Sequence, residues 1–273
     1  MKQRSGTNGG RELKTVRTAT EVIDALWDGG PCGVTELATR LSLPKSTVYT
    51  QLNTLRNGGF VTKDGDEYQL SYKFLVLGEY VRNETTLYQV ARTEVDRLAD
   101  ETGQYAHLVT EEHGRGIDLY KARGETGVGD TYQATKLQRR DHLHITASGK
   151  AILAHLPRRR VDEIVDEHGL VERTDETITD RETLSERLSE IRERGYAYND
   201  EEEVVGLRAV GAPIRRADGA VLGSISVSGP TSFVQGDRFE TTLPELVTSA
   251  ANVIEVNINM DDMRSELSET GSR

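Results

Sequence analysis

The chain has 273 residues, enough for two compact domains, and its net charge is −11. No stretch is apolar enough to cross a membrane or to act as a secretory signal, so we expect a cytoplasmic protein. The lone Cys32 excludes an internal disulfide and a cysteine-built zinc site. Residues 1–79 contain 10 Lys and Arg against 9 Asp and Glu, whereas the remainder contains 24 against 36. The acidity therefore belongs to the second part of the chain, and the first part is compatible with DNA.

The first predicted elements are an amphipathic helix over residues 15–27 and a helix-turn-helix over residues 34–56. Apolar residues follow one face of each helix, and Pro44 begins the last helix where a missing N–H costs nothing. The opposite face of that helix is polar and rich in hydroxyl and amide groups, which suits contact with phosphates and base edges. We expect DNA binding by Lys45, Ser46, Thr47, Tyr49, Thr50, Asn53 and Thr54.

A hairpin is predicted directly after this recognition helix. Gly58 and Gly59 end the helix, and β-prone runs over residues 60–63 and 67–70 flank an Asp-Gly pair, which is a strong hairpin signal. A hairpin in this place is a wing, and Lys63 on it is a further candidate for DNA contact. The alternative, an αα-hairpin that merely packs, does not account for the order of motif, breaker and hairpin. We assign residues 11–71 to a winged helix-turn-helix domain.

The rest of the chain predicts a linker helix and an α+β domain. Residues 72–86 form the linker, whose hydrophobic run 72–81 suggests contact with a partner subunit. Residues 87–262 form the second domain, in which helices pack on an antiparallel sheet. Strands are predicted over residues 105–110, 117–122, 132–137, 196–198, 206–214 and 221–228, and helices from residue 87 and over 147–155, 159–167, 181–194 and 243–260.

Two independent sets of motifs are similar to the IclR family of transcriptional regulators. LSLPKSTVYTQLNTLRNGGFV (residues 41–61) resembles the family's DNA-reading segment. HITASGKAILAHLP (144–157), residues 178–214 and GSISVSGPTS (223–232) resemble its effector-binding domain, in the same order. The resemblance covers most of residues 11–256. It implies a GAF-like effector-binding domain, a double-stranded DNA operator, a small-molecule effector, a homodimer or homotetramer, and no cofactor.

Two segments indicate where a small molecule binds. A hydroxyl N-cap followed by small residues, at 146–150, exposes N–H groups at a helix N-terminus, although an ordinary helix start has the same pattern. Ser226 and Ser228 alternate on one strand, so both hydroxyls project from the same face. Buried hydroxyls need hydrogen-bond partners, and a bound organic acid would provide them.

The family resemblance also implies the positions of the effector pocket. They are Ala147, Ser148, Asn199, Ala209, Ser226 and Ser228. Two of them depart from the best-known pattern, because Asn199 replaces an acidic residue found in some members and Ala209 replaces a cysteine. The departures leave the pocket in place and leave the identity of the effector open.

Catalytic and metal sites are weakly indicated. His142 and His144 would share one face of an extended segment, but no third ligand follows at a recognisable spacing. The acidic run 200–203 is typical of a solvated loop, and no serine lies in a nucleophile elbow. We therefore expect no metal and no catalytic residue. The rival interpretation is a small-molecule enzyme that carries an accessory DNA- or protein-binding module.

Composition further suggests a halophilic source. The chain has 8 lysines against 26 arginines together with an excess of acidic residues. This bias resembles proteins of salt-loving archaea. A GC-rich genome would explain the ratio of lysine to arginine alone, but not the excess of acid.

Overall fold

In the computed structural model the chain divides into two compact units, residues 1–84 and 85–273. The structure describes residues 12–128 and 140–270, and for residues 264–270 it describes the backbone alone. The strand predicted over residues 132–137 lies outside the described residues. Within them, no helix combines the length and the apolar composition needed to cross a membrane.

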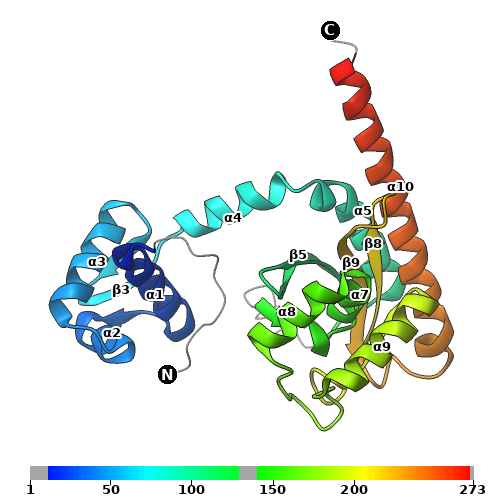
Figure 1. The fold of residues 1–273 in the computed structure, drawn as a ribbon, viewed down its shortest axis with the longest axis horizontal. Coiled ribbons are helices and arrows are strands. Elements are labelled where there is room, and N and C mark those ends of the chain that lie inside the picture. Colours follow the sequence, from blue (N-terminus) through cyan, green and yellow to red (C-terminus); the bar gives the residue numbers. More distant parts are fainter. Residues whose placement is uncertain (1–11, 129–139, 271–273) are drawn as a thin grey trace. The chain divides into compact units, whose positions relative to one another are not determined.

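The first unit is a helix-turn-helix followed by a hairpin (Figure 1). Its elements are α1 (Lys14–Gly29), β1 (Cys32–Gly33), α2 (Val34–Leu41), α3 (Lys45–Asn57), β2 (Val61–Asp64) and β3 (Glu67–Leu70). The three strands are antiparallel in the order β1-β3-β2. The predicted recognition helix and wing are present. Strand β1 was not predicted, and it places Cys32 opposite Tyr68 rather than in a turn.

A tight turn joins α2 to α3. Ser42 adopts a left-handed backbone with φ of 53°, and its N–H donates to the carbonyl of Thr39 at 3.2 Å. Pro44 directly precedes α3 with φ of −58°, a value that its ring favours. The apolar faces of the helices then meet around Val22, Leu37 and Leu52, all fully buried. This packing turns the polar face of α3 outward.

Helix α4 (Lys73–Asn83) ends the first unit and buries none of its residues. Tyr72, directly before it, is 88% exposed, and Val76 and Tyr80 are 67% and 65% exposed. These three residues follow at intervals of four and therefore share one face of the helix. An apolar stripe of this kind is a typical site of protein association.

The second unit contains a six-stranded antiparallel sheet in the order β6-β5-β4-β9-β8-β7. Its strands are β4 (Tyr105–Glu112), β5 (Arg115–Arg123), β6 (Arg140–His142), β7 (Ala197–Asp200), β8 (Leu207–Arg215) and β9 (Val221–Pro230). The sheet brings chain segments more than a hundred residues apart into register. Strand β6 and two short helical turns, Leu143–Ile145 and Arg238–Thr242, were not predicted.

Helices cover both faces of this sheet (Figure 1). Helices α5 (Thr86–Thr102) and α10 (Leu243–Thr270) pack on one face, and α7 (Ala147–His155) packs on the other with α9 (Arg181–Arg194) and α8 (Arg158–His168) beside it. Ile225 and Val227 of β9 belong to the core beneath α5 and α10. Because side chains alternate along a strand, Ser226 and Ser228 face α7.

Candidate functional site

The outward face of α3 carries the predicted DNA-binding residues. Lys45, Ser46, Tyr49, Thr50 and Thr54 are exposed, and Thr47 and Asn53 are partly exposed. The Thr50 hydroxyl donates to the carbonyl of Ser46 at 2.9 Å, and the Thr54 hydroxyl donates to the carbonyl of Thr50 at 2.9 Å. These hydroxyl oxygens can still accept hydrogen bonds, and their methyl groups face outward with them. The face therefore offers acceptors, amides, one cation and small apolar groups, which is the inventory for reading base edges.

The predicted wing residue Lys63 lies at the end of β2 and is exposed. Its ammonium lies 3.8 Å from the carboxylate of Asp66 and 5.5 Å from the ring centroid of Tyr68. Exposed ion pairs of this kind are weak, so the cation can exchange Asp66 for a phosphate at little cost.

The six predicted effector residues line one cavity in the second unit. It lies between the N-terminus of α7 and the sheet, and its volume is about 20 Å³. All six are buried: Ala147, Ser148, Asn199, Ala209, Ser226 and Ser228. A space of this size accommodates about one water molecule, so a metabolite would have to widen it.

Strand register explains why these residues meet. Asn199 of β7 pairs with Ala209 of β8, which pairs with Ser228 of β9. Ser226 pairs with Gly211 on one side and with His107 of β4 on the other. A Cβ atom on Gly211 would lie 3.0 Å from the Ser148 nitrogen, so glycine lets α7 approach the sheet this closely.

Hydrogen bonds join polar groups across the cavity. The Ser148 hydroxyl donates to the Ser226 hydroxyl oxygen at 2.7 Å. The His107 ring lies between Ser228 and Asp118, with Nε2 2.8 Å from the serine oxygen and Nδ1 3.3 Å from the carboxylate. A proton on Nδ1 facing Asp118 leaves Nε2 to accept from the Ser228 hydroxyl.

Three N–H donors also border the cavity. Thr146 caps α7, and its hydroxyl accepts from the Gly149 N–H at 2.9 Å. The N–H groups of Ala147 and Ser148 precede that bond and have no acceptor among the described residues. The Nδ2 of Asn199 is fully buried and likewise has no acceptor there. Donors at a helix N-terminus favour an anionic acceptor.

Four cavity residues were not predicted. His107, Asp118, Asp141 and Glu203 also line the cavity. His107 carried a signal, because it is a polar residue at the centre of the apolar run 105–109, where a buried side chain needs a partner. The three carboxylates reach the cavity through tertiary contacts that their local sequence does not indicate.

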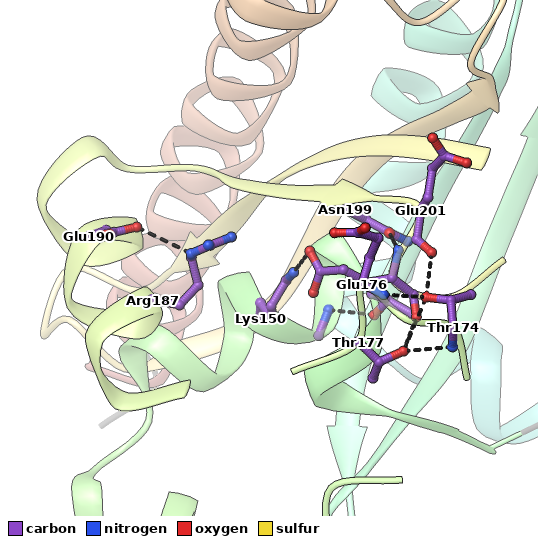
Figure 2. A network of polar contacts seen from close by, with 11 residues as sticks. Lys150, Thr174, Glu176, Thr177, Arg187, Glu190, Asn199 and Glu201 are labelled. Carbon is purple, nitrogen blue, oxygen red and sulfur yellow. Dashed lines mark hydrogen bonds and ion pairs between the residues drawn. The ribbon is translucent and has the colours of Figure 1, made fainter. Parts of the chain in front are cut away.

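The acidic run 200–203 is not the solvated loop that the sequence suggested. Glu202 and Glu203 are 4% and 8% exposed, and only Asp200 is exposed. The Glu202 carboxylate forms an ion pair with the ammonium of Lys150, which reaches it from α7 and is completely buried (Figure 2). Burial lowers the pKa of Lys150, and the nearby carboxylate opposes that shift. A charge run reads as solvated only while its partner is unknown.

The histidine pair shows no arrangement for a metal. The rings of His142 and His144 lie edge to face with centroids 5.4 Å apart, and His144 Nε2 bonds the carbonyl of Val171 at 3.1 Å. Burial, followed by the charge of Arg115, lowers the pKa of His142 to about 4. In the described part of the chain, no three His, Cys, Asp or Glu side chains are grouped to hold a metal ion.

Comparison with known families covers both units. Residues 15–65 match the IclR helix-turn-helix domain, and residues 80–256 match the bacterial transcriptional regulator IclR C-terminal domain. The chain belongs to the IclR family of transcriptional regulators. Both IclR domain models describe regulators and not enzymes, which removes the rival interpretation.

Named relatives agree with this assignment. The chain is 41% identical over 249 residues to a probable HTH-type transcriptional regulator ArcR from Halobacterium salinarum, covering 91% of this chain and 95% of that protein. An IclR transcriptional regulator from Alicyclobacillus acidocaldarius matches with a TM-score of 0.73 and 26% identity, over 90% of this chain and 99% of that one. An IclR homologue from Microbacterium hydrocarbonoxydans, complexed with 4-hydroxybenzoate, matches in fold with a TM-score of 0.76 and 20% identity, over 90% and 100%.

Proposed function

We propose that this regulator binds operator DNA sequence-specifically through α3 and the wing, and that a small carboxylate in the cavity beside α7 controls that binding. One observation carries the effector assignment. Three N–H donors without acceptors among the described residues, from Ala147, Ser148 and Asn199, border the same cavity. A carboxylate would satisfy them, because it accepts several hydrogen bonds and carries the charge that a helix N-terminus favours.

The other side of the cavity suits hydrogen-bond donors on the effector. Asp118, Asp141 and Glu203 line it, and each carboxylate can accept more hydrogen bonds than one contact uses. We therefore infer a small acid that also carries a hydroxyl or amino group. The homologue from M. hydrocarbonoxydans was crystallised with 4-hydroxybenzoate, an acid of this description.

Control of DNA binding follows from the small size of the cavity. A metabolite must separate Ser148 from Ser226, and this moves the N-terminus of α7 away from β9. An effector shifts the DNA-binding equilibrium only by its difference in affinity for the two states. A typical coupling changes operator affinity by about 5- to 150-fold.

The regulator acts as a homodimer or homotetramer in this proposal. One winged helix reads few base pairs, and a symmetric pair reads an imperfect palindrome with half-sites about 34 Å apart or at a multiple of that spacing. The exposed stripe of Tyr72, Val76 and Tyr80 on α4 supports a subunit contact next to the DNA-binding domain.

The composition and the relative from H. salinarum support a cytoplasmic protein of a halophile. High salt screens the repulsion within a chain of net charge −11. The free energy of unfolding should therefore rise between 0.1 M and 2 M KCl, and a protein equally stable at both concentrations would not fit a halophilic source.

A binding experiment tests the effector assignment directly. The full-length protein is titrated calorimetrically with acetate, L-lactate, pyruvate, succinate and 4-hydroxybenzoate, and its operator is selected from a random DNA library. We expect at least one hydroxy- or keto-acid to bind and to change affinity for the selected operator. Absence of binding by all five acids at millimolar concentration would contradict the proposal.

A further inference from the structure

A buried ion pair lies beside the cavity. Lys150 is 0% exposed and Glu202 is 4% exposed, and their ion pair joins α7 to the segment that follows β7 (Figure 2). Removing two charges from water is costly, and an apolar pair of similar volume often stabilises a protein as well or better. The pair is therefore poorly explained by stability alone, and its value lies in what it holds in place.

The same segment is held from a second direction. The Thr177 hydroxyl donates to the carbonyl of Glu202 at 2.7 Å, and the Thr174 hydroxyl donates to the carbonyl of Glu201 at 2.8 Å (Figure 2). Glu201 adopts a left-handed backbone with φ of 60°, which its surroundings must impose. Side-chain and backbone contacts together fix the position of the Glu202 peptide.

That peptide orients Asn199. The Glu202 N–H donates to Asn199 Oδ1 at 2.9 Å, and Asn199 is fully buried. An amide that accepts through Oδ1 must direct its Nδ2 elsewhere, and here Nδ2 has no acceptor among the described residues of a side chain that lines the cavity. The orientation makes Asn199 present a donor and not an acceptor to the cavity.

We propose that Lys150 and Glu202 are positioning residues that fix the Asn199 amide with its N–H group toward the effector, and thereby select a ligand with an acceptor at that point. This inference rests on the proposed effector function of the cavity. A carboxylate meets the requirement, whereas the NH₂ of the corresponding primary amide places a donor against a donor. Discrimination of this kind depends on leaving a buried polar group unpaired with the wrong ligand.

The test compares each acid with its amide in three full-length proteins. L-lactate and lactamide, and 4-hydroxybenzoate and 4-hydroxybenzamide, are titrated into the wild type, the Lys150→Met/Glu202→Leu variant and an Arg159→Met/Glu163→Leu variant. The first variant replaces the buried pair by apolar side chains, which preserves folding better than a single change that strands one charge. The second removes an exposed ion pair of α8 and serves as the matched control.

We expect the wild type and the control to prefer the acid, and the Lys150→Met/Glu202→Leu variant to lose at least tenfold of that preference while its melting temperature stays near that of the wild type. An Asn199→Asp variant, which replaces the donor by an acceptor, should favour the amide. A folded Lys150→Met/Glu202→Leu variant with an unchanged ratio would overturn the positioning role and leave the effector assignment intact. If neither acid nor any other acid of the panel above binds the wild type, the effector assignment fails, and this inference fails with it.

Discussion

Ser148 and Ser226 share a hydrogen bond of 2.7 Å between α7 and β9, although 78 residues separate them in the chain. The bond closes the cavity in which the proposed effector would bind. A ligand carboxylate that accepts from Ser148 would replace Ser226 as its partner. This exchange links ligand binding to the distance between the helix and the sheet, and its consequences can be measured.

Removing the β9 hydroxyls should abolish the response to effector. In a Ser226→Ala/Ser228→Ala variant, Ser148 and His107 lose their partners on β9. Each lost contact should weaken binding of the acid by about 0.5–1.5 kcal/mol, or up to threefold more for a bond to a charged group. Calorimetry with the acid measures the loss. Operator affinity without effector should stay near that of the wild type, and a double variant that still responds fully would place the effector elsewhere.

Substitutions on α3 should separate base reading from general affinity. Alanine at Thr47, Thr50 or Asn53 should relax base preference at one operator position and cost about 1–3 kcal/mol per base-edge contact. Lys45→Ala should weaken binding to all sequences and flatten the salt dependence. Gel-shift titrations against an operator library measure both effects.

A matched control for α3 lies on α1. Thr20 is exposed and its hydroxyl donates to the carbonyl of Arg17 at 2.8 Å, as Thr50 does to Ser46. Thr20→Ala should leave affinity and consensus unchanged. If all four α3 variants behaved like this control, the assignment of α3 as the recognition helix would be wrong.

Charges on the α4 stripe should disrupt assembly. In a Val76→Asp/Tyr80→Asp variant, carboxylates replace two apolar side chains that are exposed within this chain. Burying such charges at a subunit contact is unfavourable, so light scattering should show a smaller assembly. Operator affinity should fall because paired half-sites are lost. Val205→Asp, a similar change at a valine that is 75% exposed outside α4, should retain the wild-type mass. Equal masses for all three proteins would exclude α4 from the interface.

Acid should destabilise the second unit through His142. Its pKa is lowered to about 4 in the folded protein, below the ordinary value near 6.5, so the folded state resists protonation. The stabilising contribution of neutral His142 is complete above about pH 6.5 and is lost as the pH falls toward 4. Allowing for partial exposure, the loss should amount to about 1–3 kcal/mol.

Chemical denaturation at pH 7 and pH 4.5 measures this contribution. His142→Gln should reduce the difference in the free energy of unfolding between the two pH values, because glutamine does not titrate. His113→Asn, at an exposed residue with a left-handed backbone that asparagine tolerates, should keep the wild-type difference. A pH dependence unchanged by His142→Gln would show that its protonation does not destabilise the fold.

Local periodicity predicted the parts of the fold and site that depend on neighbours in sequence. The polar face of α3 follows from the spacing of Val48 and Leu52, and the shared face of Ser226 and Ser228 follows from strand alternation. The burial of Glu202 could not be predicted in this way. Its partner Lys150 lies 52 residues earlier, on a helix that meets the β7 edge only after the sheet forms.

His107 marks the boundary between these two cases. A histidine within an apolar strand signals a buried polar group, but its partners Asp118 and Ser228 come from two other strands. Strand order is set by the whole sheet, in which β4 lies between β5 and β9. The polar residue was therefore detectable from the sequence, and its place in the cavity was not.

The central claim is that a small carboxylate bound beside α7 changes the affinity of α3 for operator DNA. The most direct measurement is a fluorescence-anisotropy titration of the selected operator with full-length protein, with and without a saturating concentration of the acid that binds in calorimetry. We predict a change in the operator dissociation constant of about 5- to 150-fold. The same dissociation constant in both titrations, with the acid demonstrably bound, would contradict the account.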